Sequence, residues 1–377
     1  MKYLLFALIG IVVLAGGFFF FHFQGNPGEE EPLFPQKEES MPGESIETGA
    51  SKKEVLEQEE SSASESAPAI SQVEEATEEV VQKDFRMAFV LLIRSSSDAT
   101  PGRINKINEI KNAFPNSFKT ATRNLATMDT SSDIVIMTVD SGPDITSFLF
   151  DWGKYPQKFY EDHEDNFDFI SFYTAFEDQQ SQAHLPVSNA IKGIGNVNLM
   201  NSARGYGSGG RLKGLNFMGD ITIFERLQLL TIESALNALK HETGHQWCCY
   251  IMDSREENGN VPLIQEYVHW NFFLDLKSIN DGYIDPLGGT DWIEVEKNKF
   301  KVSDRLRYIE ARYSPLTLYL MGLLSAEDVP PIPLIRPFDS VIEKSTYPPN
   351  EVDGIKEFVS MEDIIAREGK WRCCFSP

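Results

Sequence analysis

The pentapeptide His241-Glu242-Thr243-Gly244-His245 constrains this chain more than any other feature of its sequence. It has the spacing H-E-x-x-H, and residues four positions apart lie one turn apart on the same face of an α-helix. Both imidazoles can therefore reach one metal ion, while Glu242 projects beside them toward a water on that ion. The motif predicts a metal-binding helix with His241 and His245 as ligands and Glu242 as the general base.

The residues around the motif also favour a helix. Between residues 231 and 247 apolar residues recur close to a period of 3.6. Thr231 suits an N-cap, and Glu233 suits the first turn, where the helix dipole stabilises negative charge. Gly244 costs about 1 kcal/mol relative to alanine inside a helix, so a plain core helix has no reason to carry it, whereas a helix that needs a close approach over a metal site does. The alternative is a buried amphipathic helix whose histidines form only hydrogen bonds.

Two segments precede the folded part. Residues 3–23 are apolar apart from His22, which is long enough for a transmembrane helix, so residues 1–23 are predicted to be a signal anchor. A cleaved signal peptide, which would leave a secreted protein, is the alternative. Residues 24–83 contain sixteen Glu and four Lys and are predicted to be a disordered acidic linker, because they cannot bury enough apolar surface to order. The expected location is the cell membrane, with residues 84–377 as one extracellular domain.

The folded part opens with a β-α-β pattern. Residues 87–93, 133–139 and 167–176 read as buried strands, and residues 104–113 read as an amphipathic helix. This order predicts an α/β fold in which helices cover a mixed sheet. A helical C-terminal lobe is expected to follow the metal helix, and residues 265–270 and 315–322 both read as helical. The net charge of −23, about half of it in the linker, argues against nucleic acid as a partner.

The four cysteines stand in two adjacent pairs, Cys248-Cys249 after the metal helix and Cys373-Cys374 near the C-terminus. Cysteines in an exported chain indicate disulfides, and four cysteines allow three pairings. Adjacent cysteines rarely bond to each other, so we expect one or two bonds between the C-terminal tail and the base of the metal helix. A zinc site made of all four lacks the usual spacing between ligands.

A catalytic zinc needs a third protein ligand and leaves one position for water. His269 is the first choice among the six histidines, with Glu266 second and Asp291 third. His163 lies in an acidic run and reads as a solvated surface residue, and His184 has no special signal. Alternatively, His269 makes an ordinary hydrogen bond within an aromatic core helix.

The motif resembles that of the zincin metallopeptidases. Cys248 and Ile251 depart from the metzincin pattern, which has Gly and His there. The chain is more similar to a group of largely uncharacterised secreted bacterial metallopeptidases with H-E-x-G-H-x-W, His-Trp, Gly-Gly-x-x-Trp and S-P-L-x-L-Y-L-M-G-L. The matching residues here are 241–247, 269–270, 288–292 and 314–323. This resemblance implies a zincin-like α+β fold and favours His269 as the third ligand.

Three further residues have open roles. Met321 reads either as a hydrophobic floor under the metal or as part of a well-packed helix. Tyr313 or Tyr319 is a candidate donor to the oxyanion of the reaction.

Together these features predict a membrane-anchored extracellular zinc metallopeptidase that hydrolyses protein or peptide substrates. Glu242 is expected to accept a proton from water and then protonate the leaving amine. Two other functions stay open: a zinc hydrolase for amide bonds in cell-wall material, and a non-catalytic surface-binding module with a structural metal.

Overall fold

The computed structural model describes residues 83–139, 153–176, 182–189, 191–192, 200–226, 230–251, 261–265, 268–276, 283–303, 311–339, 349–368 and 372–373. The predicted signal anchor, residues 1–23, lies outside the described residues, as does the predicted linker up to residue 82. Within the described ranges, no helix has both the length and the apolar character needed to cross a membrane. All described residues belong to one compact unit of the chain.

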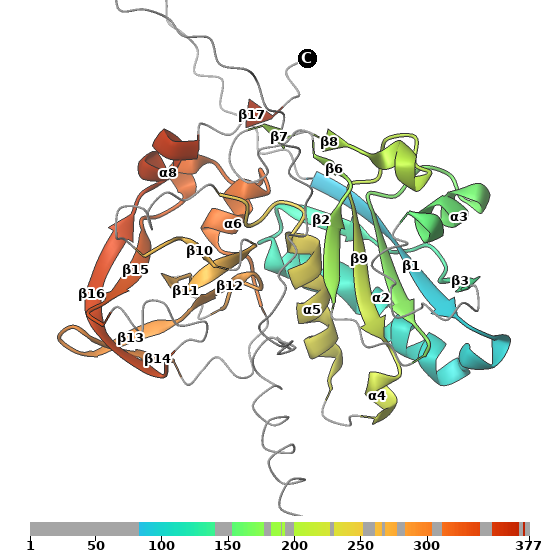
Figure 1. Ribbon diagram of the computed structural model, residues 1–377, viewed down its shortest axis with the longest axis horizontal. Helices are drawn as coiled ribbons and strands as arrows, with labels where there is room; N and C mark the ends of the chain where they lie inside the picture. The colour runs from blue at the N-terminus through green and yellow to red at the C-terminus, as the bar shows by residue number, and fades with distance from the viewer. Residues whose placement is uncertain are drawn as a thin grey trace, which may run out of the picture. The chain divides into compact units, whose positions relative to one another are not determined.

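The first sheet is mixed and has the strand order β2-β1-β4-β9-β5, with β3 also paired to β1 (Figure 1). Its strands are β1 (Lys83–Ile93), β2 (Ala126–Asp129), β3 (Val135–Thr138), β4 (Phe169–Thr174), β5 (Ala183–Pro186) and β9 (Gly214–Asp220). The pairs among β1, β2, β3, β4 and β9 are parallel, and β5 runs antiparallel to β9 at one edge. The continuous apolar run of β1 suits a central strand that is covered on both faces.

Helices cover both faces of this sheet. Phe89 and Leu91 of β1 share a core with α2 (Pro101–Ala121) and α5 (Ile232–Gly244), whereas Val90 and Leu92 share a core with α3 (Lys154–Asp162). This alternation follows from the two-residue period of a strand. Pro101 occupies the first turn of α2, and Thr100 caps it by accepting a hydrogen bond from the Arg103 backbone. The predicted α/β class, with helices over a mixed sheet, is confirmed.

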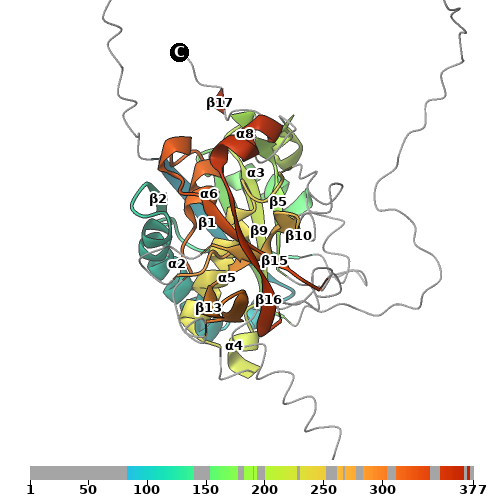
Figure 2. The ribbon, with the colours of Figure 1, turned by 90° about the vertical axis from the view of Figure 1, so that its left-hand side faces the viewer.

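The second sheet has the order β10-β11-β15-β16-β14-β13, with β12 paired to β11, and β15 and β16 face the viewer in Figure 2. Its strands are β10 (Ile264–Gln265), β11 (His269–Asp275), β12 (Gly288–Thr290), β13 (Trp292–Glu296), β14 (Lys299–Val302), β15 (Ile332–Pro337) and β16 (Glu351–Val359). Every pair is antiparallel except β11 with β12. The prediction of a helical C-terminal lobe is therefore wrong, because the part of the chain after α5 consists mainly of this sheet.

Short elements complete the described chain. There are three further short α-helices among the described residues, α4 (Ile223–Arg226), α6 (Pro315–Leu320) and α8 (Met361–Glu368). There are also three 3-10 helices in the described residues, Ser96–Asp98, Ala203–Tyr206 and Ala326–Asp328. Two small ladders pair β6 (Ser188–Asn189) with β8 (Met200–Asn201), and β7 (Ile191–Lys192) with β17 (Arg372–Cys373). One hydrophobic core joins residues of the first sheet, α2, α5, α6 and the second sheet. Helix α5 packs on β9 and presents its C-terminal half toward β11 (Figure 1).

Candidate metal centre

Helix α5 forms where the sequence predicts it. The Thr231 hydroxyl accepts a hydrogen bond of 3.1 Å from the Ser234 backbone, which satisfies a free N–H of the first turn. Leu236 and Leu239 are buried in the core, and His241 and His245 lie on the opposite side of the helix. The α-helix ends at Gly244, and His245 is its C-cap residue.

Gly244 allows α5 to pack directly on the loop before β12. A Cβ atom added there would lie 2.8 Å from Leu287 Cδ1 and 3.0 Å from Tyr313 Cε1. These separations are shorter than normal carbon contacts, so any side chain would push the loop or the tyrosine away. Another part of the chain thus does approach Gly244 closely, and the residues that do so are Leu287 and Tyr313.

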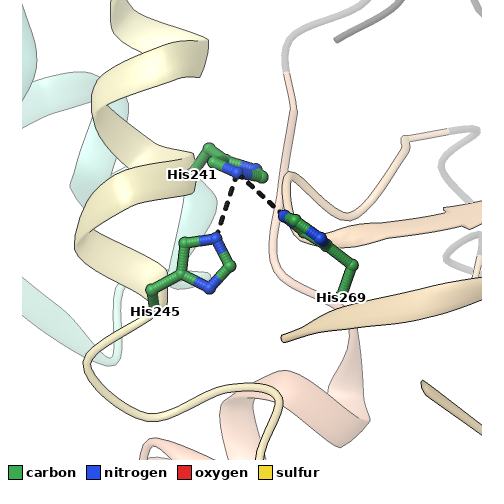
Figure 3. A group of neighbouring side chains, drawn as sticks. All are labelled: His241, His245 and His269. Atoms are coloured by element: carbon green, nitrogen blue, oxygen red, sulfur yellow. Dashed lines mark hydrogen bonds between the residues drawn. The ribbon is translucent and has the colours of Figure 1, made fainter. Parts of the chain in front are cut away.

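The structure brings His241 and His245 of α5 together with His269, the first residue of β11 (Figure 3). One ligand atom from each ring lies within 4.8 Å of the others, and the three residues could hold a metal ion. The Nε2 atom of His241 lies 3.1 Å from His245 Nε2 and 3.3 Å from His269 Nε2. His269 follows His245 by 24 positions and His241 by 28, and the fold brings it next to both of them.

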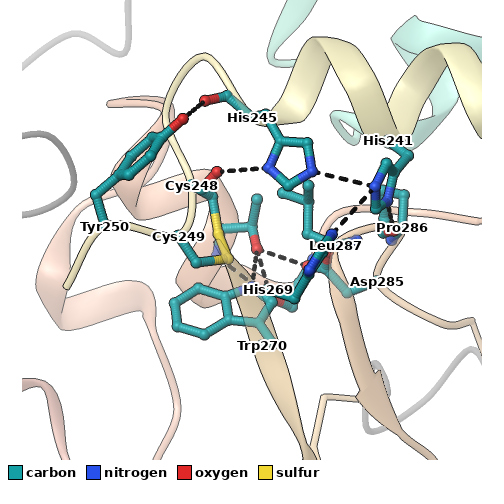
Figure 4. The surroundings of a disulfide bond; sticks show 12 residues. His241, His245, Cys248, Cys249, Tyr250, His269, Trp270, Asp285, Pro286 and Leu287 are labelled. Carbon is teal, nitrogen blue, oxygen red and sulfur yellow. Dashed lines mark hydrogen bonds between the residues drawn. A yellow bond between two sulfur atoms is a disulfide. The ribbon is translucent and has the colours of Figure 1, made fainter. Parts of the chain in front are cut away.

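The other ring nitrogens explain why these Nε2 atoms face one another. His241 Nδ1 donates to the Pro286 carbonyl at 2.6 Å, and His245 Nδ1 donates to the Cys248 carbonyl at 3.1 Å (Figure 4). Burial lowers the pKa of His241 to about 4 and that of His269 to about 3, and it lowers the pKa of His245 well below the ordinary value. The rings of His241 and His245 are therefore neutral at pH 7 and direct Nε2 lone pairs toward each other.

Converging lone pairs repel unless a cation lies between them. Two nitrogens bound at 2.0–2.1 Å to a tetrahedral ion lie roughly 3.3 Å apart. The observed Nε2 separations of 3.1 and 3.3 Å match that spacing closely. Two of the three nitrogen–nitrogen separations therefore suit a shared metal ion, and the three histidines could hold one.

Glu242 lies beside the three histidines. Its side chain is buried, and Oε1 is 4.0 Å from His241 Nε2. Burial raises the pKa of Glu242 to about 8, because a carboxylate loses hydration there. A carboxyl group with this pKa can both accept and release a proton near neutral pH.

A short loop, residues 285–287, contacts both elements that provide the histidines. Pro286 accepts the hydrogen bond from His241, and the Leu287 carbonyl accepts one of 2.9 Å from the Trp270 backbone, next to His269. Buried Asp285 fixes the loop by accepting hydrogen bonds from the Ser314 backbone at 2.7 Å and from Thr317 Oγ1 at 2.6 Å. This loop therefore sets the orientation of the first ligand.

The other stretches named in the resemblance meet at the same place. Ser314 caps α6 by accepting a hydrogen bond from the Thr317 backbone, and Trp270 Nε1 donates to Thr317 Oγ1 at 2.9 Å. Gly288 has a φ of +117°, and a Cβ atom there would lie 2.6 Å from the Trp270 carbonyl oxygen. Glycine is needed because β12 runs so close to β11. These residues hold the strand that begins with His269.

The expected disulfide between the C-terminal tail and the metal helix is wrong. Cys248 is bonded to its neighbour Cys249, and the peptide bond between them is cis. Cys373 lies in β17, which pairs with β7. The Cys248 carbonyl orients His245, and the Tyr250 hydroxyl donates to the His245 carbonyl at 2.8 Å (Figure 4). The cysteine pair therefore belongs to the surroundings of the metal centre.

Of the two rival ligands, the structure describes only Asp291. Asp291 is buried between β12 and β13 and lies outside the group of three histidines, whereas Glu266 lies outside the described residues. The segment that begins at His269 is a strand, so the expected helix there is wrong. His163 stacks on Phe159 and contacts its carbonyl at 2.8 Å, which supports a structural role.

Two tyrosines and a methionine were candidates for further roles. The Tyr313 hydroxyl donates to the Lys240 carbonyl at 2.6 Å, so it stabilises the backbone of α5. Tyr319 and Met321 are both buried, and the Met321 carbonyl accepts a hydrogen bond from Lys83 Nζ at 3.0 Å. These contacts favour packing roles for the end of α6.

His184 has a place in the site that its sequence context did not indicate. Its Nδ1 lies 2.7 Å from Asn216 Oδ1 and its Nε2 lies 3.2 Å from Gln246 Oε1. Asn216 also donates to Thr243 Oγ1 at 3.0 Å. This network joins β5 and β9 to the end of α5. No local signal marked it, because its members are spread over 62 positions.

No protein-family model matches the chain, and no curated protein matches its sequence. The three-histidine cluster and its surroundings are therefore the basis for the function proposed below.

Proposed function

We propose that this protein is a zinc-dependent hydrolase that cleaves peptide bonds, with His241, His245 and His269 as the metal ligands. The observation that supports it most is the convergence of three neutral imidazole nitrogens beside a buried carboxyl group. Three protein ligands with one open position are typical of catalytic zinc, whereas structural zinc usually has four.

Imidazole nitrogen is a common ligand of zinc, and no cysteine belongs to the cluster among the described residues. Calcium and magnesium prefer oxygen ligands, so an all-nitrogen set disfavours them. When bound, zinc would lower the pKa of a water in its open position and polarise the carbonyl of a substrate.

Glu242 would act on the protons of the reaction. In its ionised form it accepts a proton from the attacking water, and it then gives that proton to the departing amine nitrogen. A nearby cation lowers the pKa of a carboxyl group, so the value of about 8 would fall when the metal is present. The buried position of Glu242 prevents bulk water from competing for the proton.

The location is also a proposal. The apolar segment of residues 3–23 supports a membrane anchor, and the bonded pair Cys248–Cys249 supports an oxidising compartment outside the cytoplasm. The metal centre would then meet substrates on the outer side of the membrane.

The Glu242→Gln variant tests the proposed reaction. Glutamine keeps the shape of the side chain but cannot accept the proton, so zinc content should stay near one ion per chain while the cleavage rate falls by at least about 100-fold. Zinc is measured by mass spectrometry of the metal, and cleavage is measured with a broad peptide library. Glu362→Gln, the same change at an exposed position of α8, is the matched control and should keep full activity.

Two results would count against this proposal. Zinc-loaded wild-type chain that cleaves no peptide in the library would contradict peptide-bond hydrolysis, and release of amines from cell-wall material by the same sample would support an amidase instead. Metal binding without hydrolysis of either material would support a non-catalytic binding module.

A further inference from the structure

A cavity of about 120 Å³ lies beside the N-terminal half of α5, apart from the three histidines. Its walls come from the ends of β4 and β9, from α4 and from α5. The lining includes Tyr173, Asp220, Phe224, Ser234, Ala235 and Ala238. Ser234, Ala235 and Ala238 are half-buried, so solvent reaches this side of the helix.

The cavity and the metal cluster share one face of α5. At 100° per residue, Ser234, Ala238, His241 and His245 fall within roughly 60° of arc on the helix surface. Leu236 and Leu239 point to the other side, into the core. A molecule that extends from the histidines toward the start of α5 would therefore pass over Ala238 and Ser234.

The distance along the helix suits neighbouring parts of one substrate. A rise of 1.5 Å per residue places Ala238 about 4.5 Å from His241 along the axis, and Ser234 about 10 Å from it. One extended peptide residue spans roughly 3.3 Å. The cavity is therefore within two to three residues of a bond held at the metal cluster.

The lining selects for size and charge. A cavity of roughly 150 Å³ holds benzene, so about 120 Å³ accommodates a leucine or methionine side chain and at most a phenyl ring. Most wall residues are apolar, including Phe224 and Ala235. Among the described residues the wall contains no cationic residue, and its one carboxylate, Asp220, is ion-paired with Arg226 at 2.6 Å, so the lining offers no positive charge to bind an acidic side chain.

Tyr173 adds one polar group to this wall. Its side chain is 4% exposed, and its hydroxyl has no hydrogen-bond partner among the described residues. Burial raises the pKa of Tyr173, so the phenol is neutral. A buried hydroxyl without a partner is destabilising, and a polar atom on a bound molecule or a water would satisfy it.

We propose that this cavity receives an apolar side chain of the substrate, of leucine to phenylalanine size, close to the bond that is cut. This inference rests on the proposed peptidase function. It assigns Ala238 as the residue that sets the depth of the cavity on the α5 side, because a larger side chain there would fill the space next to the histidines.

Ala238→Leu is the variant that tests the assignment, and dipeptide hydroxamates that differ only in one side chain are the probes. For the zinc-loaded wild-type chain, the leucine and phenylalanine compounds should bind at least about tenfold more tightly than the glycine and aspartate compounds. In Ala238→Leu this ratio should fall to less than twofold. Ala366→Leu, at an exposed position of α8, is the matched control and should keep the wild-type ratio.

A second measurement separates this inference from the proposed function. N-acetyl-phenylalaninamide, which needs no metal, should raise the melting temperature of the metal-free wild-type chain more than N-acetyl-glycinamide does, and Ala238→Leu should remove the difference. If Ala238→Leu fails to fold, Ala238→Val takes its place. Equal binding of all side chains, or an unchanged preference in the filled variant, would overturn the cavity assignment even if the chain cleaves peptides. If the wild-type chain prefers the phenylalanine compound but cleaves no peptide, the cavity assignment is supported and only the peptidase proposal is contradicted.

Discussion

The C-terminal half of α5 is tightly enclosed, whereas its N-terminal half borders an open cavity. At residues 239–244, the Pro286 carbonyl orients the imidazole of His241, and Leu287 and Tyr313 leave no room for a side chain at Gly244. At residues 232–238, the wall retains about 120 Å³ of space. One helix thus combines rigid positioning of metal ligands with room for a variable group, and the two halves should respond differently to substitution.

The largest expected effect is at the third ligand. His269→Ala should remove bound zinc almost entirely, because two imidazoles are fewer than the three that catalytic zinc sites use. Metal content after equilibration with a buffered zinc solution is the measurement. Glu266→Ala is the control and should keep wild-type zinc. If His269→Ala retains full zinc while Glu266→Ala loses it, the ligand assignment is wrong.

A smaller loss of metal is expected from the loop that orients His241. Asp285→Asn should weaken zinc affinity by roughly 10–100-fold, as removal of partners behind a ligand commonly does. Asparagine keeps the size but loses charge in its hydrogen bonds to Ser314 and Thr317. Competition with a coloured chelator gives the affinity. An affinity equal to wild type would show that the loop does not control the ligand.

Stability should distinguish the two halves of α5 directly. Gly244→Ala places a methyl group against Leu287 and Tyr313, and such overpacking should lower the free energy of unfolding by about 1–3 kcal/mol despite the better helix propensity of alanine. Ala238→Leu, in the open half, should lower it far less. Urea unfolding of the metal-free proteins provides both values, and equal losses would contradict the difference in packing.

The smallest effect is expected at the start of the helix. Thr231→Ala removes the hydrogen bond to the Ser234 backbone and should cost about 1 kcal/mol of stability. Zinc affinity should remain unchanged, because the ligands lie more than two turns away. A large drop in affinity would mean that the two halves of α5 are coupled.

Local signals explain what the sequence predicted well. The cap at Thr231, the apolar period of α5 and the spacing of His241 and His245 all act within one helix, so they survive in the structure. The strand β1 was also predictable, because its apolar run is long and continuous. The choice of His269 over Asp291 agrees with the cluster that the structure forms.

Other features depend on parts of the chain that are distant in sequence. Residues 269–275 are all buried, and a short apolar run does not distinguish a strand from a helix by its period. The carbonyl of Pro286 could come from any residue type, so no sequence signal marks it. The bond between Cys248 and Cys249 was not predicted, because the prediction rested only on the rarity of disulfides between adjacent cysteines. The cavity exists only because β4, β9, α4 and α5 pack as they do.

X-ray absorption spectroscopy at the zinc edge tests the central claim most directly. The full-length chain, loaded with one equivalent of zinc, should show about three imidazole nitrogens and one oxygen at roughly 2.0–2.1 Å. His269→Ala should lose one of the imidazole contributions. Sulfur neighbours at roughly 2.3 Å, or a spectrum that His269→Ala leaves unchanged, would contradict a centre formed by His241, His245 and His269.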